Sequence, residues 1–482
     1  MPVSAAYQSA PVHAALGEGY FDAVLPAHFP QRILRYRNDA WAQRIGLETL
    51  TDDEWVTHFG RFAALPQNLS QPLALRYHGH QFRAYNPDLG DGRGFLFAQM
   101  RDAVDGRLLD LGTKGSGQTP YSRQGDGRLT LKGGVRELLA TSMLEALGVN
   151  TSKTFSLIET GENLVRNDEP SPTRSSVLVR LSHSNIRIGT FQRLAFEGDT
   201  AKINRLIDHI LLHYFADVGA AVKDASPAER ALAVLTETCR RVAETGAAWM
   251  AAGFVHGVLN TDNINITGES FDYGPYRFLP HYDPQFTAAY FDHTGLYAYG
   301  RQPDTLMWNL TRFAECLMGV AERDALIDAL DMFPQTFEPA LANAICRRLD
   351  LVPLGHEQDL DLVSALYAFL HATKMPFEQV FFDWYGGLRS QARAASSPVA
   401  AHYASPEFAA VKTLLAQYTT ANPERLSHRY FAGVRPCTLL IDEIETIWAA
   451  IADHDHWKPL TDKVAAIAEM SQAFDVNSVL AP

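Results

Sequence analysis

Residues 256–263 read His-Gly-Val-Leu-Asn-Thr-Asp-Asn, and residues 272–274 read Asp-Tyr-Gly. Asn263 offers an amide oxygen and Asp272 a carboxylate, and both are oxygen ligands of the kind that Mg²⁺ prefers. The apolar, β-type residues between them predict a short hairpin that would bring these two side chains together. We therefore predict a divalent-metal site at Asn263 and Asp272, for Mg²⁺ or, alternatively, Mn²⁺.

The spacing of this segment is that of a catalytic loop. The step of seven from His256 to Asn263 occurs in kinase-like small-molecule phosphotransferases, and the triplet from Asp272 stands where kinases carry Asp-Phe-Gly. Those enzymes keep a catalytic Asp at the position of Val258, whose side chain cannot accept a proton. Asp262 is the only carboxylate within residues 256–263, so we predict that it acts as the base.

Two glycine-bearing turns lie upstream, at residues 89–94 and 122–128. Alternate glycines let backbone amides approach a phosphate closely, and the neighbouring arginines add positive charge. Neither turn is a Walker A loop, because the pattern GxxxxGK[ST] occurs nowhere in the chain. The predicted nucleotide-binding residues of these turns are Gly90, Gly92, Arg93, Arg123, Asp126 and Gly127.

Four further charged residues complete the predicted ATP site. Lys114 ends a β-type run, and Glu137 lies in the next predicted helix, so the two could form the lysine–glutamate pair of a kinase. Arg180 and Arg187 follow at and just beyond another β-type run, and guanidinium groups bind phosphate oxygens in pairs. This excess of arginine predicts that the phosphates lie differently from those in an ordinary kinase.

The order of predicted elements indicates an α+β, two-lobed protein-kinase-like fold. A small antiparallel sheet is predicted from strands at 94–100, 108–113, 155–159 and 177–181, with one helix at about 134–147. Long amphipathic helices follow from residue 204, with breaks expected at Pro334, Pro353, Pro398 and Pro423. The expected parts are an N-terminal extension of short helices (1–75), a kinase-like N-lobe (76–203), a C-lobe (204–340) and a helical C-terminal region (341–482).

Composition limits the possible partners. The formal net charge of −13 argues against broad binding to nucleic acid. No apolar run is long enough to cross a membrane, and the N-terminus has no secretory signal. None of the four cysteines has CxxC spacing, which favours reduced thiols in a cytoplasmic protein.

Taken together, these segments resemble the SelO/YdiU family of kinase-fold protein adenylyltransferases. The resemblance covers roughly residues 20–310, with the motifs in the order of the family. The motifs are GHQF (79–82), LGDGR (89–93), the stretch from KGSG to Lys132 (114–132), GVREL (134–138), HGVLNTDN (256–263) and DYGP (272–275).

The resemblance implies a chemistry. Members of this family bind ATP in a flipped orientation and transfer AMP to Ser, Thr or Tyr hydroxyl groups of proteins, releasing pyrophosphate. It also implies the role of each matching residue: Asp262 as the proton acceptor, Asn263 and Asp272 as the metal ligands, and Gly90, Gly92, Arg93, Lys114, Glu137, Asp126, Gly127, Arg180 and Arg187 as contacts of the nucleotide.

The C-terminal third departs from the family pattern. Leu-Ser-His-Arg at 426–429 stands where Leu-Arg-Asn-Tyr is expected, and residues 478–482 lack the terminal Cys or selenocysteine motif of some members. We therefore expect no redox control through the tail. Two alternatives stay open: a kinase that transfers the γ-phosphate, and a non-catalytic, nucleotide-binding pseudokinase, which the valine at position 258 would allow.

Overall fold

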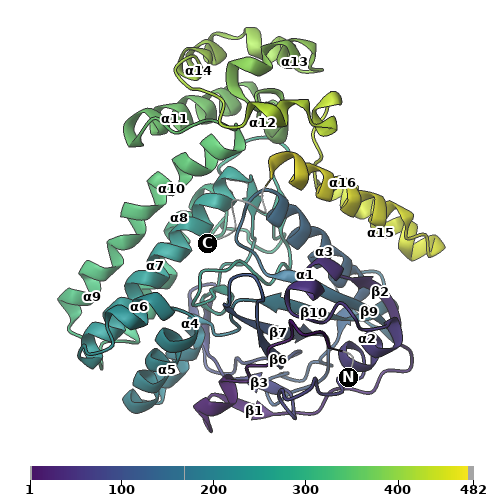
Figure 1. Ribbon diagram of the computed structural model, residues 1–482, viewed down its shortest axis with the longest axis vertical. Helices are drawn as coiled ribbons and strands as arrows, with labels where there is room; N and C mark the ends of the chain where they lie inside the picture. The colour runs from purple at the N-terminus through teal and green to yellow at the C-terminus, as the bar shows by residue number, and fades with distance from the viewer. Residues whose placement is uncertain (1–2, 168, 476–482) are drawn as a thin grey trace.

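The computed structural model describes residues 3–167 and 169–475 and has a mixed α/β architecture (Figure 1). Among these residues, one antiparallel sheet of eight strands follows the order β1-β3-β6-β7-β10-β9-β2, with β8 paired to β10. Its strands are β1 (Phe21–Ala23), β2 (Ile33–Arg37), β3 (Leu73–Leu75), β6 (Leu96–Arg101), β7 (Leu108–Lys114), β8 (Leu129–Thr130), β9 (Lys153–Leu164) and β10 (Thr173–Ser182). Two small pairs lie outside it: β4 (Gly79–Gln81) with β5 (Ala84–Asn86), and β11 (Phe254–Val255) with β12 (Arg277–Phe278).

The four strands predicted between residues 94 and 181 are confirmed as β6, β7, β9 and β10. Residues 1–75 contain the expected short helices, but they are not helical throughout. Helices α1 (Asp39–Arg44) and α2 (Asp52–Phe59) are there, but β1, β2 and β3 also join the main sheet. β1 and β3 have three residues each, too few to show an alternating pattern, so their pairing with the sheet rather than local sequence makes them strands.

Helix α3 (Leu131–Ala146) packs on β9 and β10. It begins three residues before the predicted start because the Thr130 side chain caps it, accepting a hydrogen bond from the N–H of Gly133. Gly134 faces the sheet closely: a Cβ on it would lie 2.5 Å from Cδ1 of Leu157. This close approach carries Glu137, one turn later, to the end of β7.

The rest of the chain is mostly helical, as predicted. Figure 1 shows α4–α10 beside the sheet and α11–α14 at the end of the molecule farthest from it. The helices are α4 (Ile188–Phe196), α5 (Thr200–His213), α6 (Ala216–Ala221), α7 (Pro227–Ala251), α8 (Gln302–Glu315), α9 (Arg323–Leu330), α10 (Met332–Arg348), α11 (His356–Thr373), α12 (Phe377–Asp383), α13 (Gln391–Ser396), α14 (Pro406–Leu415), α15 (Ile441–His454) and α16 (Lys458–Phe474).

One expected helix break is misplaced. Pro334 lies in the first turn of α10, where proline is tolerated because its missing N–H would have no partner in the helix. The division of the chain at residues 75, 203 and 340 stays a prediction. The tail at 478–482 lies outside the described residues. Within the described ranges, no helix is long and apolar enough to span a membrane.

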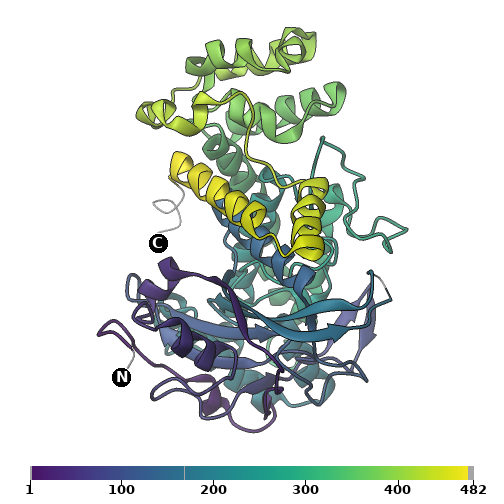
Figure 2. The same cartoon turned by 90° about the vertical axis from the view of Figure 1, so that its right-hand side faces the viewer.

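The last two helices return to the sheet. Figure 2 shows α15 and α16, in yellow, between the sheet and the outer helices, and both contact α3. Lys132 of α3 forms an ion pair with Glu445 of α15, with 2.7 Å between Nζ and Oε2. The helix that carries Glu137 is therefore held between the sheet and the C-terminal helical pair.

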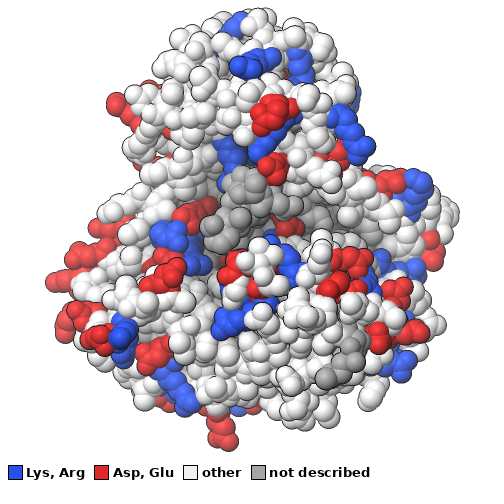
Figure 3. Space-filling model, in the orientation of Figure 1, with Lys and Arg blue, Asp and Glu red and all other residues white. Residues whose placement is uncertain are grey.

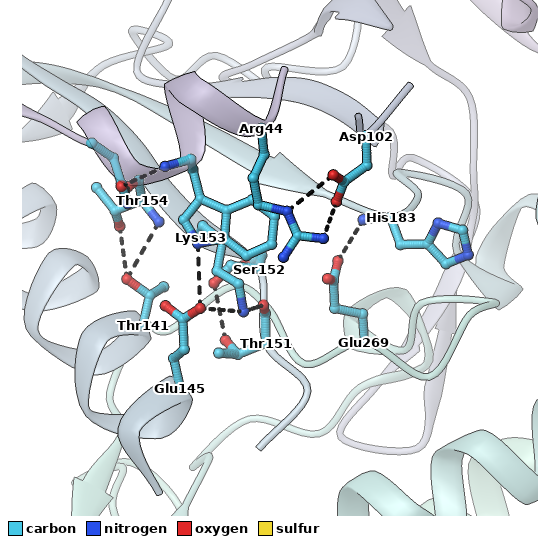
Figure 4. Close-up of polar contacts among 12 residues, drawn as sticks. Arg44, Asp102, Thr141, Glu145, Thr151, Ser152, Lys153, Thr154, His183 and Glu269 are labelled. Carbon is cyan, nitrogen blue, oxygen red and sulfur yellow. Dashed lines mark hydrogen bonds and ion pairs between the residues drawn. The ribbon is translucent and has the colours of Figure 1, made fainter. Parts of the chain in front are cut away.

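Polar contacts fix the connections around the start of β9 (Figure 4). Arg44 of α1 points its guanidinium group at the buried Asp102, and Glu269 accepts a hydrogen bond from the N–H of His183 at 2.8 Å. The backbone N–H of Ser152 donates to the carbonyl of Ser270 at 2.9 Å. The connection between α3 and β9 is thus tied to the segment that leads into Asp272.

Candidate active site

A cleft of about 810 Å³ lies between the sheet and the loops at residues 262 and 272. Its volume is within the range of roughly 300–1,000 Å³ that is usual for small-molecule sites. Its described lining has seven basic and four acidic side chains, although the whole chain has a net charge of −13. They are Arg93, Lys114, Arg123, Arg128, Arg166, Arg180 and Arg187, and Asp91, Asp126, Asp262 and Asp272. This local excess of positive charge suits an anionic ligand such as a nucleotide.

The excess of basic side chains is local to the cleft lining. On the face shown in Figure 3, basic and acidic side chains are intermixed and form no broad basic patch. This face does not resemble the basic stripe with which proteins follow a nucleic-acid backbone.

The structure joins the predicted lysine, glutamate and metal ligands in one network. Nζ of Lys114 lies 2.6 Å from Oε2 of Glu137 and 2.7 Å from Oδ1 of Asp272. The other oxygen of Asp272 accepts a hydrogen bond from Nδ2 of Asn263 at 3.0 Å. Lys114 of β7, Glu137 of α3, Asn263 of η2 (Thr261–Asn263) and Asp272 therefore meet at one side of the cleft. The hairpin expected between Asn263 and Asp272 is not formed: residues 264–271 contain no strand, and Asn265 and Ser270 make single bridges to Arg187 and Thr151 instead.

Asp262 lies in η2, next to this network, and is almost fully buried. The strand β4 packs against it, because a Cβ built on Gly79 would lie 3.0 Å from Oδ1 of Asp262. That same oxygen has no hydrogen-bond partner among the described residues. A buried carboxylate oxygen without a partner at the cleft is well placed to accept a proton or hydrogen bond from a bound group.

Two arginines face the same carboxylates. Nη1 of Arg187 donates to the backbone carbonyl of Asp262 at 2.8 Å, and its guanidinium group lies 4.8 Å from the ring centre of Phe271. Nη1 of Arg180 lies 3.3 Å from Oε1 of Glu137 and 3.6 Å from Oδ1 of Asp272. Both arginines therefore lie where they can bind phosphate oxygens near the predicted metal ligands.

The glycine turns form the outer walls of the cleft. A Cβ on Gly90 would lie 2.3 Å from the ring of Tyr121, so only glycine fits there. Gly127 has a φ of +68°, and a Cβ on it would lie 2.2 Å from the carbonyl oxygen of Gly117. Asp126 is fixed by two hydrogen bonds from Arg166, at 2.8 and 3.0 Å. Sequence position alone does not predict this last contact.

Asp262 and Asp272 have opposite electrostatic environments. Burial raises the pKa of Asp262 to about 6, and the nearby charge of Asp272 adds to this effect, whereas Arg187 opposes it. Burial also acts to raise the pKa of Asp272, but the positive charges of Lys114, Arg180 and Arg187 outweigh it and hold the pKa well below its usual range. Asp272 is therefore ionised near neutral pH.

The residues present fit a hard divalent cation. Oδ1 of Asn263 is buried and has no hydrogen-bond partner among the described residues. Its Nδ2 donates to Asp272, so the Asn263 amide group lies next to the Asp272 carboxylate. An amide oxygen and an ionised carboxylate are donors that Mg²⁺ and Mn²⁺ accept.

Comparisons with known proteins identify the family of the chain. A family model described as "Protein adenylyltransferase SelO" matches residues 3–468. The chain belongs to the SelO family. It is 45% identical over 471 residues to the protein nucleotidyltransferase YdiU of Synechocystis sp., which covers 94% of this chain and 96% of that relative. It is 43% identical over 467 residues to the protein of the same name from Trichodesmium erythraeum, covering 95% and 97%.

Membership of the SelO family confirms the resemblance drawn from the motifs and places the chain among the protein nucleotidyltransferase enzymes. The match also extends further than residues 20–310. It includes most of the C-terminal third, where the sequence at 426–429 differs from the expected segment. The helices α11–α16 therefore belong to the family match almost to their end.

The cleft includes residues that the motif analysis did not assign. Tyr77 stacks on Arg187, with 4.5 Å from the guanidinium carbon to the ring centre, and Asp91 lies 3.5 Å from the same arginine. Gln81 and Arg166 also line the cleft. Asp91 lies within the motif LGDGR and Gln81 within GHQF, so these motifs could have marked both residues as part of the site. Arg166 lies in the turn between β9 and β10, and no local pattern marks it.

Proposed function

We propose that this SelO-family chain transfers AMP from ATP to Ser, Thr or Tyr hydroxyl groups of proteins and releases pyrophosphate. The observation that carries the proposal is the position of Oδ1 of Asp262. This oxygen has no partner among the described residues and lies at a cleft where basic side chains outnumber acidic ones. Arginines that bind the terminal phosphates of ATP would leave the α-phosphorus facing the acceptor.

The transfer would proceed in one displacement. The acceptor hydroxyl oxygen forms a bond to the α-phosphorus, the bond from that phosphorus to the bridging oxygen of the β-phosphate breaks, and the electron pair leaves with pyrophosphate. The hydroxyl proton passes to Asp262. Arg180, Arg187 and Lys114 stabilise the negative charge that grows on the leaving group, which is the main catalytic contribution in phosphoryl chemistry.

Asn263 and Asp272 would hold the metal, Mg²⁺ or Mn²⁺. When bound there, the cation would neutralise phosphate charge. Lys114 keeps Asp272 in place from one side and Asn263 does so from the other. Glu137 in turn keeps Lys114 directed at the cleft.

The proposal includes a two-lobed, protein-kinase-like arrangement. The sheet with α3 would form one lobe and the helices from α4 onward the other, with the cleft between them. The Lys114–Glu137 pair joining β7 to α3 supports it, as does Asp272 in the loop between β11 and β12. A cytoplasmic location is part of the same proposal, and the burial of Cys239, Cys316 and Cys346 as free thiols is in keeping with it.

A labelling experiment tests the transferred group. The protein is incubated with an unfolded protein mixture and Mg²⁺, together with ATP labelled at either the α- or the γ-phosphate. We expect label on protein from α-labelled ATP only, and none with an Asp262→Asn variant. Label from γ-labelled ATP would instead show a kinase. ATP binding with no transfer of either label would show a non-catalytic nucleotide-binding protein.

A further inference from the structure

The hairpin of β4 and β5 is attached directly to the catalytic loop. The N–H of His80 donates to Oγ1 of Thr261 at 2.7 Å, and the N–H of Phe82 donates to Oδ1 of Asn260 at 3.1 Å. Gly79 at the start of the hairpin packs on Asp262, and Gln81 lines the cleft. The hairpin therefore leads outward from the carboxylate that would receive the acceptor proton.

Exposed aromatic rings begin where the hairpin leaves the cleft. Phe82 is 41% exposed, and its ring centre lies 5.9 Å from that of Phe291. Phe291 is 40% exposed and lies 5.1 Å from the ring of Tyr290, which is 77% exposed. We call these three residues, Phe82, Tyr290 and Phe291, the aromatic strip. A row of large exposed rings is a common sign of an interaction surface.

The backbone under the strip is firmly held. The buried Asp292 accepts hydrogen bonds from the N–H groups of Leu296 and Tyr297, at 2.9 and 2.8 Å. The Tyr297 hydroxyl donates to Asn260 at 2.6 Å, and its ring lies 5.0 Å from that of Phe82. The strip is thus presented by an anchored turn next to η2, and its position relative to Asp262 is fixed.

The conformation of the hairpin turn has an energetic cost. Phe82 has a φ of +49° and Arg83 a φ of +66°, in the left-handed region that residues with a Cβ rarely adopt. Two-residue β-hairpin loops favour turns with positive φ, and Phe82 and Arg83 are the two loop residues between the paired Gln81 and Ala84. The hydrogen bonds from Phe82 N–H to Asn260 and Tyr297 hold the turn in place, with Phe82 partly exposed beside Phe291.

We propose that the aromatic strip binds the acceptor segment of the protein substrate by an apolar or aromatic side chain next to the modified hydroxyl. This inference rests on the proposed function. When the acceptor hydroxyl lies at Asp262, the rest of the substrate segment must leave the cleft past the β4–β5 hairpin. Gly79 and Phe82 are three residues apart, about 10 Å along an extended chain. The recognised side chain would therefore lie about two to four residues from the acceptor in an extended segment.

The chemistry of the strip favours apolar recognition over charge recognition. Its three side chains carry no charge, and the nearby Arg83 is directed to Trp308, with 5.5 Å from its guanidinium carbon to the ring centre. Burying an exposed aromatic ring against an apolar partner stabilises a complex through the area removed from water. Substrates with Phe, Leu or Tyr near the hydroxyl should be preferred to those with Asp, Lys or Ser.

A peptide scan tests the preference. One Ser is placed in a peptide of Gly, Asn and Gln, Phe is placed in turn at every other position, and transfer from α-labelled ATP is measured. We expect kcat/KM to rise about tenfold when Phe lies two to four residues from the Ser, because roughly 1.4 kcal/mol of apolar burial corresponds to a factor of ten. A flat profile would overturn the inference and leave the proposed function standing.

A double variant links the preference to the strip. Tyr290→Ser with Phe291→Ser should raise the KM for the preferred peptide about tenfold, with kcat and the affinity for ATP little changed, and should flatten the scan. Leu212→Ser in α5, which removes another exposed apolar side chain, is the control and should change none of these.

Three results would contradict the inference in distinguishable ways. An unchanged scan in the double variant would exclude the strip as the docking surface. A change in oligomeric state on sedimentation, with transfer unaffected, would show that the strip binds a second copy of the chain. No α-label on any peptide or protein, with ATP still bound, would overturn the proposed function and the inference with it.

Discussion

Asp262 presents a buried carboxylate oxygen with no partner in the described part of the chain. We expect Asp262→Asn to lower kcat for AMP transfer about 10²–10⁴-fold, because the amide keeps the shape but cannot take a proton. ATP affinity should stay the same or rise slightly, since a negative charge beside the phosphates is removed. Initial rates and calorimetric ATP binding check this. A variant with nearly unchanged kcat would exclude Asp262 as the base.

Asp272 is central to the network of Lys114 and Asn263. Asp272→Ala should abolish the part of ATP binding that depends on Mg²⁺ and should abolish transfer with it, because the anionic metal ligand is lost. ATP titrations with and without Mg²⁺ measure the effect. Asp453→Ala, which removes an exposed carboxylate in α15, is the control. If ATP binding depended on Mg²⁺ equally in the Asp272→Ala and Asp453→Ala variants, the assignment of Asp272 as a metal ligand would be contradicted.

The sequence predicted the residues of the cleft well where they lie in short motifs. Asp262, Asn263 and Asp272 lie near one another because they belong to the one loop that joins β11 to β12, and Lys114 meets Glu137 because a strand and the following helix carry them. Arg166 could not be predicted in this way. Its contact with Asp126 depends on where the turn between β9 and β10 lies after the sheet has formed.

At the scale of elements, the turn that contains Gly127 can be tested against a matched glycine. Gly127 and Gly106 both have positive φ, +68° and +73°, but a Cβ on Gly127 would meet the Gly117 carbonyl, whereas Gly106 faces open space. Gly106→Ala should lower the free energy of unfolding by about 1–2 kcal/mol from backbone strain. Gly127→Ala should lower it by roughly 1–3 kcal/mol more from the steric clash, and should weaken ATP binding.

Chemical denaturation and ATP titration of the two glycine variants give both quantities. Similar stability and equal ATP affinity would show that the turn at Gly127 is not constrained by Gly117. Loss of ATP affinity in Gly106→Ala alone would contradict the placement of the nucleotide turn.

Element prediction succeeded where the sequence pattern was long enough. Long amphipathic helices were expected after residue 204, and α7 (Pro227–Ala251) is one of them, because a capping box at Ser226 and an apolar face define it. The strands β1 and β3 were missed because they are short and are stabilised by their neighbours in the sheet. Pro334 was expected to break a helix and instead lies within the first turn of one.

At the scale of the molecule, a buried network joins the sheet to the helical part. Asp110 of β7 accepts hydrogen bonds from Gln99 of β6 and from the backbone of Asn185, and the Tyr214 hydroxyl at the end of α5 lies 3.4 Å away. Burial raises the pKa of Asp110 to about 7. The hydrogen bonds lower this pKa, and the negative charge of Glu269 raises it slightly. The protonated form is therefore favoured in the folded state.

The raised pKa of Asp110 sets the sign of a stability effect. Its contribution is complete below the unfolded pKa, near 4, and is lost as the pH rises through about 7. The Asp110→Asn variant has no titratable group at this position. The difference in unfolding free energy, variant minus unchanged protein, should therefore rise by about 2–4 kcal/mol from pH 4 to pH 8. Denaturant unfolding across this range measures the difference. A difference that does not vary with pH would contradict the buried, protonated Asp110.

The position of ATP in the cleft tests the account most directly. A crystal structure with a non-hydrolysable ATP analogue and Mg²⁺ would give the distances from Asp262 and from the guanidinium groups of Arg180 and Arg187 to each phosphorus. The account predicts the terminal phosphates at the two arginines and the α-phosphorus on the side of Asp262. A γ-phosphorus nearest Asp262, with the α-phosphorus shielded from the acceptor side, would contradict AMP transfer.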